Sequence, residues 1–577
     1  MFNRNPKDEV KFRAKIVILT TIGLSAVLIA NLFRLQIIEA NKYELLSKKN
    51  RIRVSPILPK RGRIITSDGK IVARNAYRYK LLMERCKGKN FQENIEFLNS
   101  RVKLEESDLA RIANSRKKRL PLILIKDELT WDEYCRLSMI LFKINGAFIE
   151  KAYAREYPMA FEFAHIVGHV SKNKNDPSIL IGKTGIEAEL NDLLFGKIGN
   201  VQTEVNSVGR KVRIIDSQAP IDGSDVTLTI DSRLQKYVCD VLSHEKAGAC
   251  VVLDISNGEV LAMASTPSFD PNLLAGKMTR DQWNAIANDP LFPLLNRAID
   301  CSYPPGSIFK IIVAFAALSE GVISPNDKIF CGGGVKLEDR TLHCWNRGGH
   351  GYMNLSDALI FSCDCYFFEL ARRLGINAIA KYAEKFGYGS KTDLELSSEN
   401  VGLVPSKSWK LLRRGTSWKP YETLIVGIGQ GSLLATLTQS AVMFGKIFTG
   451  DYDFSPTLIK GERKERVKNP IDSKLLEIIK EALRRVCLYG TASGSCLTDY
   501  GIFGKTGSSQ VRTIKTNEAG KDQKLFQWER RDHAFFVGCA PYKNPKYVVA
   551  VFVEHGGGGA SVAAPIARKI FDKLMEK

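Results

Sequence analysis

A run of 18 residues without a charged side chain, residues 16–33, is the feature that most constrains how this chain can fold. As a helix it would be about 27 Å long, close to the thickness of the hydrocarbon core of a bilayer. The run ends in Asn31-Leu32-Phe33-Arg34, which offers no small residues for cleavage by signal peptidase. We therefore expect a retained transmembrane anchor over residues 16–36, rather than a cleaved signal peptide or a buried core helix.

The charges around this run predict its orientation. Basic side chains precede it at Arg4, Lys7, Lys11, Arg13 and Lys15. Because Lys and Arg are enriched on the cytoplasmic side of membrane spans, residues 1–15 should form a cytoplasmic tail. The chain is then a single-pass protein of the cytoplasmic (inner) membrane, with everything from about residue 37 onward in the periplasm.

The length and the charge of the chain limit the possible classes further. With 577 residues, it is too long for a single hydrophobic core. It carries 84 Lys and Arg against 62 Asp and Glu, a formal net charge of +22. Such a surplus favours an anionic polymer or an anionic membrane surface as partner. The sequence contains no nucleic-acid-binding module and no basic stripe interleaved with aromatic residues, so nucleic acid is not an expected partner.

Sequence patterns divide the periplasmic part near residue 225. Residues 37–225 mix short strand-like runs with polar helices and hold no catalytic constellation, as expected for a non-catalytic pedestal of the dimerisation type. Beyond them, strand patterns lie near both ends of the chain's second half, at residues 226–230, 249–255, 259–264, 533–539 and 547–553. We expect a mixed α/β fold in which residues 226–577 form one domain, whose sheet is assembled from both ends of that segment.

The first candidate catalytic motif is Ser307-Ile308-Phe309-Lys310. It follows two prolines and a glycine and precedes an apolar helical run over residues 311–318. Residues three apart share one face of a helix, so the Lys310 amine can meet the Ser307 hydroxyl. An amine in that place can activate the serine as a nucleophile. A lone S-x-x-K arises by chance in many chains of this length, so the motif needs support from elsewhere.

Two further motifs supply that support. Ser362-Cys363-Asp364 comes 55 residues after Ser307, and Lys505-Thr506-Gly507-Ser508 comes later still. The ordered set S-x-x-K, S-x-N and K-T-G is typical of penicillin-recognising serine enzymes. Lys183-Thr184-Gly185 repeats the last tripeptide, yet it precedes the serine and continues as Ile186-Glu187. We interpret that copy as a tight turn entering a helix, without a catalytic role.

With these motifs, the chain resembles the class B penicillin-binding proteins, and most closely their elongation type, penicillin-binding protein 2. The similar segments run through nearly the whole length, at residues 34–36, 59–62, 68–69, 157–158, 165–168, 182–187, 296–297, 349–351, 427–431 and 504–510. The resemblance implies an elongated α+β pedestal and then a transpeptidase domain, whose central antiparallel sheet is flanked by helices. It also implies a peptidoglycan D,D-transpeptidase that cross-links stem peptides during cell elongation and cell-shape maintenance.

The resemblance assigns roles to the matching residues. Ser307 would attack the carbonyl of the penultimate D-alanine of a stem peptide, while Lys310 in its neutral form takes the proton. Ser362 would relay that proton to the departing D-alanine. The substrate's terminal carboxylate would be bound at Lys505, Thr506, Gly507 and Ser508. Backbone N–H groups of Ser307 and Ser508 would form the oxyanion hole, and β-lactams would acylate Ser307 by the same route.

Asp364 departs from the usual pattern, because the middle motif normally ends in Asn, although penicillin-binding protein 2 members often carry Asp there. A cationic Lys505 near Lys310 should lower the pKa of Lys310, whereas a carboxylate near Lys310 favours its ammonium form. Asp364 could therefore contact Lys310, face Lys505 or accept a substrate amide, and the sequence leaves these alternatives open.

Other classes share part of this pattern. A serine β-lactamase has the three motifs but does not need a long pedestal and a retained anchor. A D,D-carboxypeptidase or a division-type transpeptidase of the same family shares the chemistry. A catalytically silent scaffold has no need of Ser307, Lys310 and Lys505 together. Nothing in the chain resembles a glycosyltransferase, so the resemblance implies a SEDS-type glycan polymerase in the membrane as partner.

A cluster of soft metal ligands overlaps the middle motif. Cys331, Cys344, His350 and Cys363 lie within 33 residues, and Cys365 and His343 are reserve candidates. Three thiolates and one imidazole suit a closed tetrahedral zinc site. A disulfide is a rival outside the cytoplasm, and unrelated buried thiols are another. Some penicillin-binding protein 2 relatives place Asp, His and Cys ligands for zinc in this region, so a structural Zn²⁺ with Cys in place of Asp is implied.

Overall fold

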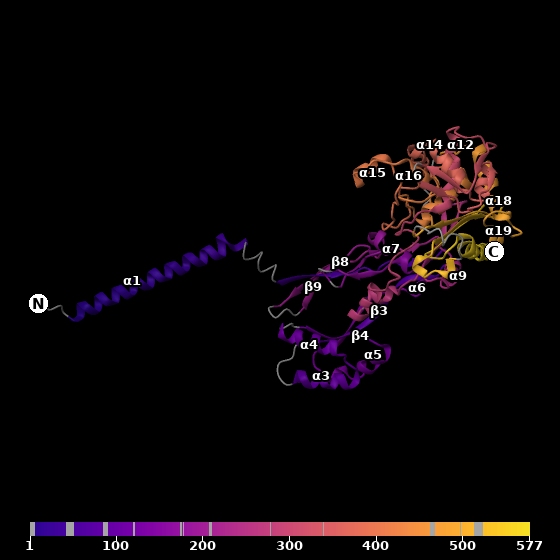
Figure 1. The fold of residues 1–577 in the computed structure, drawn as a ribbon. Helices are drawn as coiled ribbons and strands as arrows, with labels where there is room; N and C mark the ends of the chain where they lie inside the picture. The colour runs from indigo at the N-terminus through magenta and orange to yellow at the C-terminus, as the bar shows by residue number, and fades with distance from the viewer. Residues whose placement is uncertain are drawn as a thin grey trace. The chain divides into compact units, whose positions relative to one another are not determined.

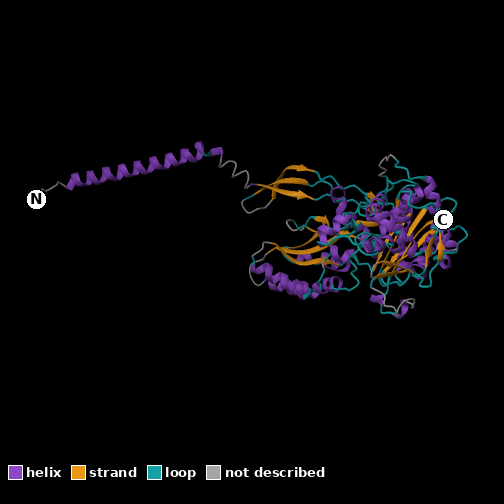
Figure 2. Cartoon of the chain, turned by 45° about the horizontal axis from the view of Figure 1, so that its top comes forward, coloured by secondary structure: helices purple, strands orange, loops and turns teal. Residues whose placement is uncertain are grey.

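The computed structural model describes residues 6–41, 51–84, 90–118, 122–173, 176, 178–206, 211–276, 278–337, 340–461, 468–496, 498–512 and 523–576. They form the mixed α/β structure that the sequence predicted (Figure 2). By their contacts they divide into two compact units, residues 1–60 with 195–223 and residues 61–194 with 224–577.

The first unit contains the N-terminal helix and a small sheet. Helix α1, Pro6–Phe33, continues into a π-helical turn, Arg34–Ile38. Val10–Ile38 contains an 18-residue window with a mean hydropathy of 2.3, and it is the single helix in the described residues that is long and apolar enough to cross a membrane. The predicted anchor helix is therefore confirmed as a helix of suitable length. The antiparallel sheet has the order β1-β8-β9, with bounds Ile52–Ile57, Gly199–Val205 and Lys211–Gln218 (Figure 1).

In the second unit, the pedestal residues build a five-stranded sheet. Its order is β10-β2-β3-β4, and β5 also pairs with β3. The strands are β2 Ile64–Ile65, β3 Ile71–Glu84, β4 Leu122–Leu129, β5 Ala147–Glu156 and β10 Val226–Thr227. Helices α3 Asn90–Arg101, α4 Glu106–Lys117 and α5 Trp131–Ser138 enclose a separate small core, to which β3 and β4 contribute.

Other pedestal residues share a core with the second half of the chain. Helices α6, Ala160–Val167, and α7, Gly185–Glu189, bury Phe163, Ile166 and Ile186 in the largest hydrophobic cluster. That cluster extends to Phe552 near the C-terminus. Residues 61–194 are therefore packed as one unit with residues 224–577.

The second half of the chain is organised by a second five-stranded sheet of order β12-β11-β19-β18-β17, and all of its neighbouring strands are antiparallel. The strands are β11 Gly248–Asp254, β12 Glu259–Thr266, β17 Phe503–Ser509, β18 His533–Ala540 and β19 Tyr547–Val553. The prediction of a sheet assembled from both ends of this segment is confirmed. Because β17 is an edge strand, one side of it is free to meet other elements.

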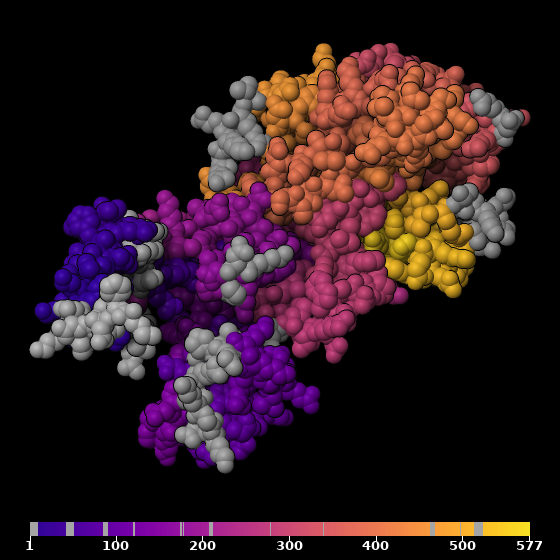
Figure 3. Space-filling model, turned by 90° about the vertical axis from the view of Figure 1, so that its left-hand side faces the viewer, coloured from indigo at the N-terminus to yellow at the C-terminus, as the bar shows by residue number. Residues whose placement is uncertain are grey.

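Both faces of this sheet are buried, because alternate side chains along each strand enter different cores. Val251 and Ala550 belong to the largest cluster, whereas Val252 and Val551 belong to a second cluster with the terminal helices. Helices α9, Ser232–Leu242, and α20, Ala564–Met575, cover that second face. In Figure 3 the yellow C-terminal segment lies beside magenta residues from the start of this domain. Helix α17, Leu437–Thr449, packs on the first face.

A helical part lies next to the sheet and carries the first two catalytic motifs. Its helices are α12 Lys310–Ser319, α13 Leu355–Ile360, α14 Asp364–Lys385, α15 Lys407–Arg414, α16 Pro420–Gly427 and α18 Ser473–Leu488 (Figure 1). Two small hairpin-like sheets, β13 Ile329–Cys331 with β16 Gly351–Met353 and β14 Gly334–Leu337 with β15 Arg340–His343, lie between α12 and α13 in sequence. Helix α18 contacts β17, which brings this part against the edge of the sheet.

Candidate functional site

Ser307 lies where the chain turns into a buried helix. It is the middle residue of a 3-10 turn, Gly306–Ile308, and Lys310 then begins helix α12, as the sequence predicted. Gly306 has φ +58°, and a Cβ atom there would lie 2.5 Å from the Ser508 carbonyl oxygen. Only glycine fits that backbone conformation so close to a strand. The turn that carries Ser307 is therefore pressed against the open edge of β17.

Lys310 joins the first motif to the middle motif. Its side chain is 0 % exposed. Its Nζ donates to the Ser362 carbonyl oxygen at 2.8 Å, to Ser362 Oγ at 3.2 Å and to Asp364 Oδ1 at 2.6 Å. The question that the sequence left open is thereby answered, because Asp364 contacts Lys310. The carboxylate also lies in the first turn of α14, where the helix dipole favours negative charge.

Lys505 is buried on β17, and its side chain is also 0 % exposed. Burial, followed by the positive charge of Lys310, lowers the pKa of Lys505 from 10.5 to about 7. The sequence predicted a cation at this position. The structure gives instead a buried amine whose pKa lies near neutrality, and no carboxylate within the described residues lies within ion-pair distance of it.

The rest of the third motif lines the same edge. The Ser508 carbonyl accepts a hydrogen bond from Gln430 Nε2 at 2.9 Å, so it points away from the neighbouring strand β18. In an antiparallel strand the N–H and C=O of one residue point the same way, so the Ser508 N–H also faces the open edge. That is where an oxyanion-hole donor beside the Ser307 turn has to point. Thr506 Oγ1 lies 2.9 Å from Thr491 Oγ1.

Gly507 serves close packing. A Cβ atom there would lie 2.9 Å from the Pro305 carbonyl oxygen, so a larger residue would push the serine turn away from the strand. Gly507 thus lets the backbone of β17 approach the backbone of the Ser307 turn, beside the place where the substrate is expected to bind. The sequence identified Gly507 but missed Gln430 and Thr491. Gln430 lies in the 427–431 segment that carries the family resemblance, and that was the only signal for it.

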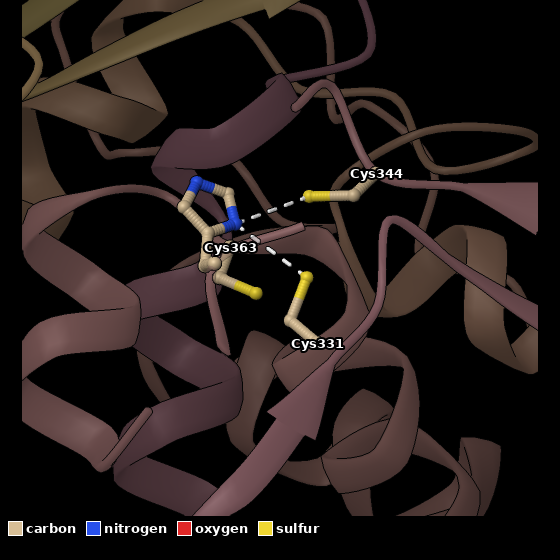
Figure 4. Close-up of side chains that lie close together, drawn as sticks. Cys331, Cys344 and Cys363 are labelled. Atoms are coloured by element: carbon tan, nitrogen blue, oxygen red, sulfur yellow. Dashed lines mark hydrogen bonds between the residues drawn. The ribbon is translucent and has the colours of Figure 1, made fainter. Parts of the chain in front are cut away.

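The four predicted metal ligands converge. One ligand atom from each of Cys331, Cys344, His350 and Cys363 lies within 4.8 Å of the others. His350 Nδ1 is 3.5 Å from Cys331 Sγ and 3.6 Å from Cys344 Sγ. Figure 4 shows the three labelled thiols directed toward a common space. The reserve candidate His343 is exposed on β15, whereas Cys365 is buried.

This donor set fits a tetrahedral zinc ion. With Zn–S near 2.3 Å and Zn–N near 2.0 Å, neighbouring ligand atoms of a tetrahedron are about 3.6 Å apart, as found here between the imidazole and the two thiols. His350 Nε2 is buried and has no hydrogen-bond partner within the described residues. Three thiols and one imidazole nitrogen thus meet the chemistry and the spacing of a structural zinc site.

Comparison with known proteins identifies the family. Residues 248–572 match the model described as the penicillin binding protein transpeptidase domain, and residues 56–228 match the penicillin-binding protein dimerisation domain. The chain therefore belongs to the penicillin-binding proteins that carry a transpeptidase domain.

Individual relatives and solved structures show which members of the family this chain is similar to. The chain is 34% identical to the peptidoglycan D,D-transpeptidase MrdA of Escherichia coli K12, over 98% of this chain and 94% of that protein. Its structure is similar to PBP2 of Helicobacter pylori in a complex with MreC, with a TM-score of 0.82, 29% identity, and 91% of this chain and 99% of that chain covered. A chain from work on structural coordination of polymerization and crosslinking by a peptidoglycan synthase complex gives a TM-score of 0.71 and 28% identity, with 97% of each chain covered.

Proposed function

We propose that this protein is a peptidoglycan D,D-transpeptidase of the elongation type, which cross-links stem peptides through a Ser307 acyl-enzyme and maintains cell shape. The observation that carries the proposal is the meeting of three separate motifs. The Ser307 turn, the buried Lys310–Ser362–Asp364 group and the open edge of β17 lie together. The near full-length similarity to a protein named peptidoglycan D,D-transpeptidase supports the substrate and the reaction.

In the acylation step, Ser307 Oγ attacks the carbonyl carbon of the penultimate D-alanine. Lys310 takes the serine proton, and the developing oxyanion is bound by the N–H groups of Ser307 and Ser508. Ser362, whose Oγ lies 3.2 Å from the lysine amine, passes the proton to the nitrogen of the terminal D-alanine as the peptide bond breaks. Free D-alanine leaves, and an ester on Ser307 remains.

In the second step, the amine of another stem peptide attacks this ester. A new amide forms, the ester breaks, and the Ser307 oxygen recovers a proton. A β-lactam enters the first step in the same way, because its strained amide replaces the D-alanyl-D-alanine bond. We expect its adduct to be stable, since no residue of the motifs is assigned to direct water onto the ester.

The contact of Lys310 with Asp364 has to loosen before the amine can take the serine proton, because Asp364 Oδ1 lies 2.6 Å from it. Lys505 lies near the same group, and burial together with the charge of Lys310 lowers the pKa of Lys505 to about 7. When the substrate's carboxylate binds beside Lys505, its negative charge favours a proton on Lys505.

We propose that Cys331, Cys344, His350 and Cys363 hold a structural Zn²⁺. Such an ion supplies no chemistry to the reaction and holds the loop around Cys363 against the β13 and β15 region. Elemental analysis of the purified protein should find about one equivalent of zinc. Less than about a tenth of an equivalent, with a Cys331–Cys344 disulfide in the peptide map, would refute the site.

We further propose that residues 1–15 lie in the cytoplasm and the catalytic domain in the periplasm, as the basic flank of the apolar helix indicates. Alkaline phosphatase should be active when fused after Lys577 and inactive when fused after Lys15. A cytoplasmic reporter that is active at the C-terminus would contradict this topology.

Two of the similar structures bear on the partners of this chain. One similar structure is a complex of PBP2 with MreC, and another comes from work on a peptidoglycan synthase complex that couples polymerization and crosslinking. We propose, as the family resemblance implies, that this chain works with a membrane-embedded, SEDS-type glycan polymerase. Co-purification of the full chain with such a polymerase, lost when residues 1–36 are replaced, would test the role of the anchor.

The central experiment is labelling with a fluorescent penicillin. The purified full chain should form one stable adduct, and mass spectrometry should place it on Ser307. The Ser307→Ala variant should not be labelled, while its melting temperature stays the same. Rapid hydrolysis of benzylpenicillin would indicate a β-lactamase instead, and release of D-alanine without cross-linked product would indicate a D,D-carboxypeptidase.

A further inference from the structure

Trp345 lies beside the catalytic group and was not singled out by any motif. It follows Cys344 directly, and the residue is 61 % exposed. Even so, both of its N–H groups are bound to the middle motif. The backbone N–H donates to Asp364 Oδ2 at 2.8 Å, and indole Nε1 donates to the carbonyl oxygens of Phe361 at 3.1 Å and Ser362 at 3.2 Å.

The acceptors that Trp345 binds are the ones that hold Lys310. The Ser362 carbonyl oxygen accepts from both the lysine amine and the indole. The Asp364 carboxylate accepts from the lysine through Oδ1 and from the Trp345 backbone through Oδ2. Trp345 therefore binds two groups that also bind Lys310, the Ser362 carbonyl and the Asp364 carboxylate.

The middle motif needs such an external hold. Ser362 has φ +54°, in the left-handed region that non-glycine residues rarely adopt. A side chain with a Cβ atom is strained there, and such a conformation persists only when neighbouring groups hold it. The two carbonyls that accept from the indole belong to Phe361 and to Ser362 itself, at the turn between α13 and α14.

We infer that Trp345 is a positioning residue for the acylation step, which holds the strained Ser362 turn and Asp364 in the arrangement that Lys310 requires. This inference rests on the function proposed above. Trp345 also adjoins the candidate zinc site. The centroids of its ring and the His350 ring are 5.4 Å apart, and its neighbour in sequence is Cys344. One short segment thus connects the ligand cluster with the oxygens around the catalytic lysine.

The test removes the indole N–H and keeps an aromatic ring. In the full chain in detergent, Trp345→Phe retains the backbone N–H to Asp364 and loses only the bonds to the two carbonyls. We expect the first-order acylation constant k2 for benzylpenicillin to fall about fivefold, the equivalent of about 1 kcal/mol for one neutral hydrogen bond. The dissociation constant of the non-covalent complex, the melting temperature and the zinc content should not change.

Trp283→Phe is the matched control. Trp283 lies on α11, Arg280–Ala287, and the residue is 46 % exposed, so we expect no change in k2. Because k2 is first-order, it does not depend on the fraction of folded protein, so a variant that folds less well still gives a result.

The outcomes separate this inference from the proposed function. A Trp345→Phe variant with wild-type k2, labelled on Ser307, would overturn the positioning role and leave the transpeptidase assignment intact. Weaker non-covalent binding with unchanged k2 would assign the ring to ligand contact and would also overturn it. Labelling that persists in Ser307→Ala would instead refute the proposed function itself.

Discussion

The tripeptide Lys-Thr-Gly occurs in two regions of this molecule and has opposite surroundings in them. At residues 183–185 it forms a turn. Gly185 has φ +61° and begins α7, the Thr184 hydroxyl lies 3.0 Å from His169 Nδ1, and the Lys183 side chain is exposed. At residues 505–507 it is part of strand β17, and the Lys505 side chain is 0 % exposed. The same tripeptide thus forms the turn before a helix in one place, and in the other it lies in a strand with its lysine buried.

The charges near the two copies sharpen the contrast, because each region buries two basic side chains for one carboxylate. Near the first copy, the side chain of Glu187 is 0 % exposed and lies 2.6 Å from both Arg61 Nε and Arg155 Nε. Guanidinium groups stay protonated in proteins, and both of these share the one Glu187 carboxylate. In the catalytic group, as far as the described residues show, Asp364 forms its ion pair with Lys310, and Lys505 has a pKa of about 7. Amines in place of guanidiniums allow the proton to move, as an enzyme requires.

The largest effect should come from Lys310→Ala. Without its amine, the Ser307 hydroxyl has no base, and we expect acylation by benzylpenicillin to fall by at least about 1,000-fold, within the range of general base catalysis. Lys410→Ala is the control, because Lys410 is also buried and its Nζ lies 2.6 Å from Glu422, away from the motifs. That variant should lose stability but keep its acylation constant. Stopped-flow labelling of both variants decides the matter, and equal losses would contradict a special role for Lys310.

The comparison of Lys505→Ala with Lys183→Ala tests directly whether only the second copy of the tripeptide takes part in acylation. Removal of the buried amine eliminates a charge-assisted hydrogen bond to the substrate carboxylate, which is worth about 1.5–3 kcal/mol. We expect the acylation efficiency to fall about 10- to 100-fold for Lys505→Ala and not at all for Lys183→Ala. If both variants acylate like the wild type, the third motif has been assigned to the wrong lysine.

These contrasts also show what the sequence could and could not predict. The anchor helix, the strands at both ends of the domain and the helix after Ser307 follow from local periodicity and turn residues, and the structure confirms them. The contact of Asp364 with Lys310 and the burial of Lys505 depend on contacts between distant segments. Gln430 reaches Ser508 across 78 positions, and no local pattern encodes such a contact. Trp345 was missed for the same reason, since its partners belong to another turn of the chain.

The pH dependence of binding should show the poised state of Lys505. The substrate carboxylate is ionised throughout the neutral range, so only the protonated fraction of Lys505 changes. That fraction falls as pH rises through a pKa of about 7, and binding of penicillin to Ser307→Ala, which cannot be acylated, should weaken about fivefold from pH 7 to pH 8. Arginine cannot lose its proton, so Ser307→Ala with Lys505→Arg should bind independently of pH. An unchanged slope in the arginine variant would assign the titration to another group.

The smallest effect on catalysis should come from Glu187→Gln, although the same change should cost much stability. It removes the carboxylate between Arg61 and Arg155 and leaves two buried guanidinium groups without a counter-charge. Breaking a buried ion pair in this way costs about 3–5 kcal/mol of the free energy of unfolding. Ile186, next to Glu187, belongs to the core that also contains the helix after Ser307, but within the described residues the triad has no hydrogen bond with the motifs. We therefore expect k2 of the molecules that remain folded to match the wild type. Denaturant unfolding measures the free energy of unfolding, and stopped-flow labelling measures k2. A fall in k2 that accompanies the loss of stability would show that the pedestal charges influence the catalytic lysines, and the two regions would then no longer be independent.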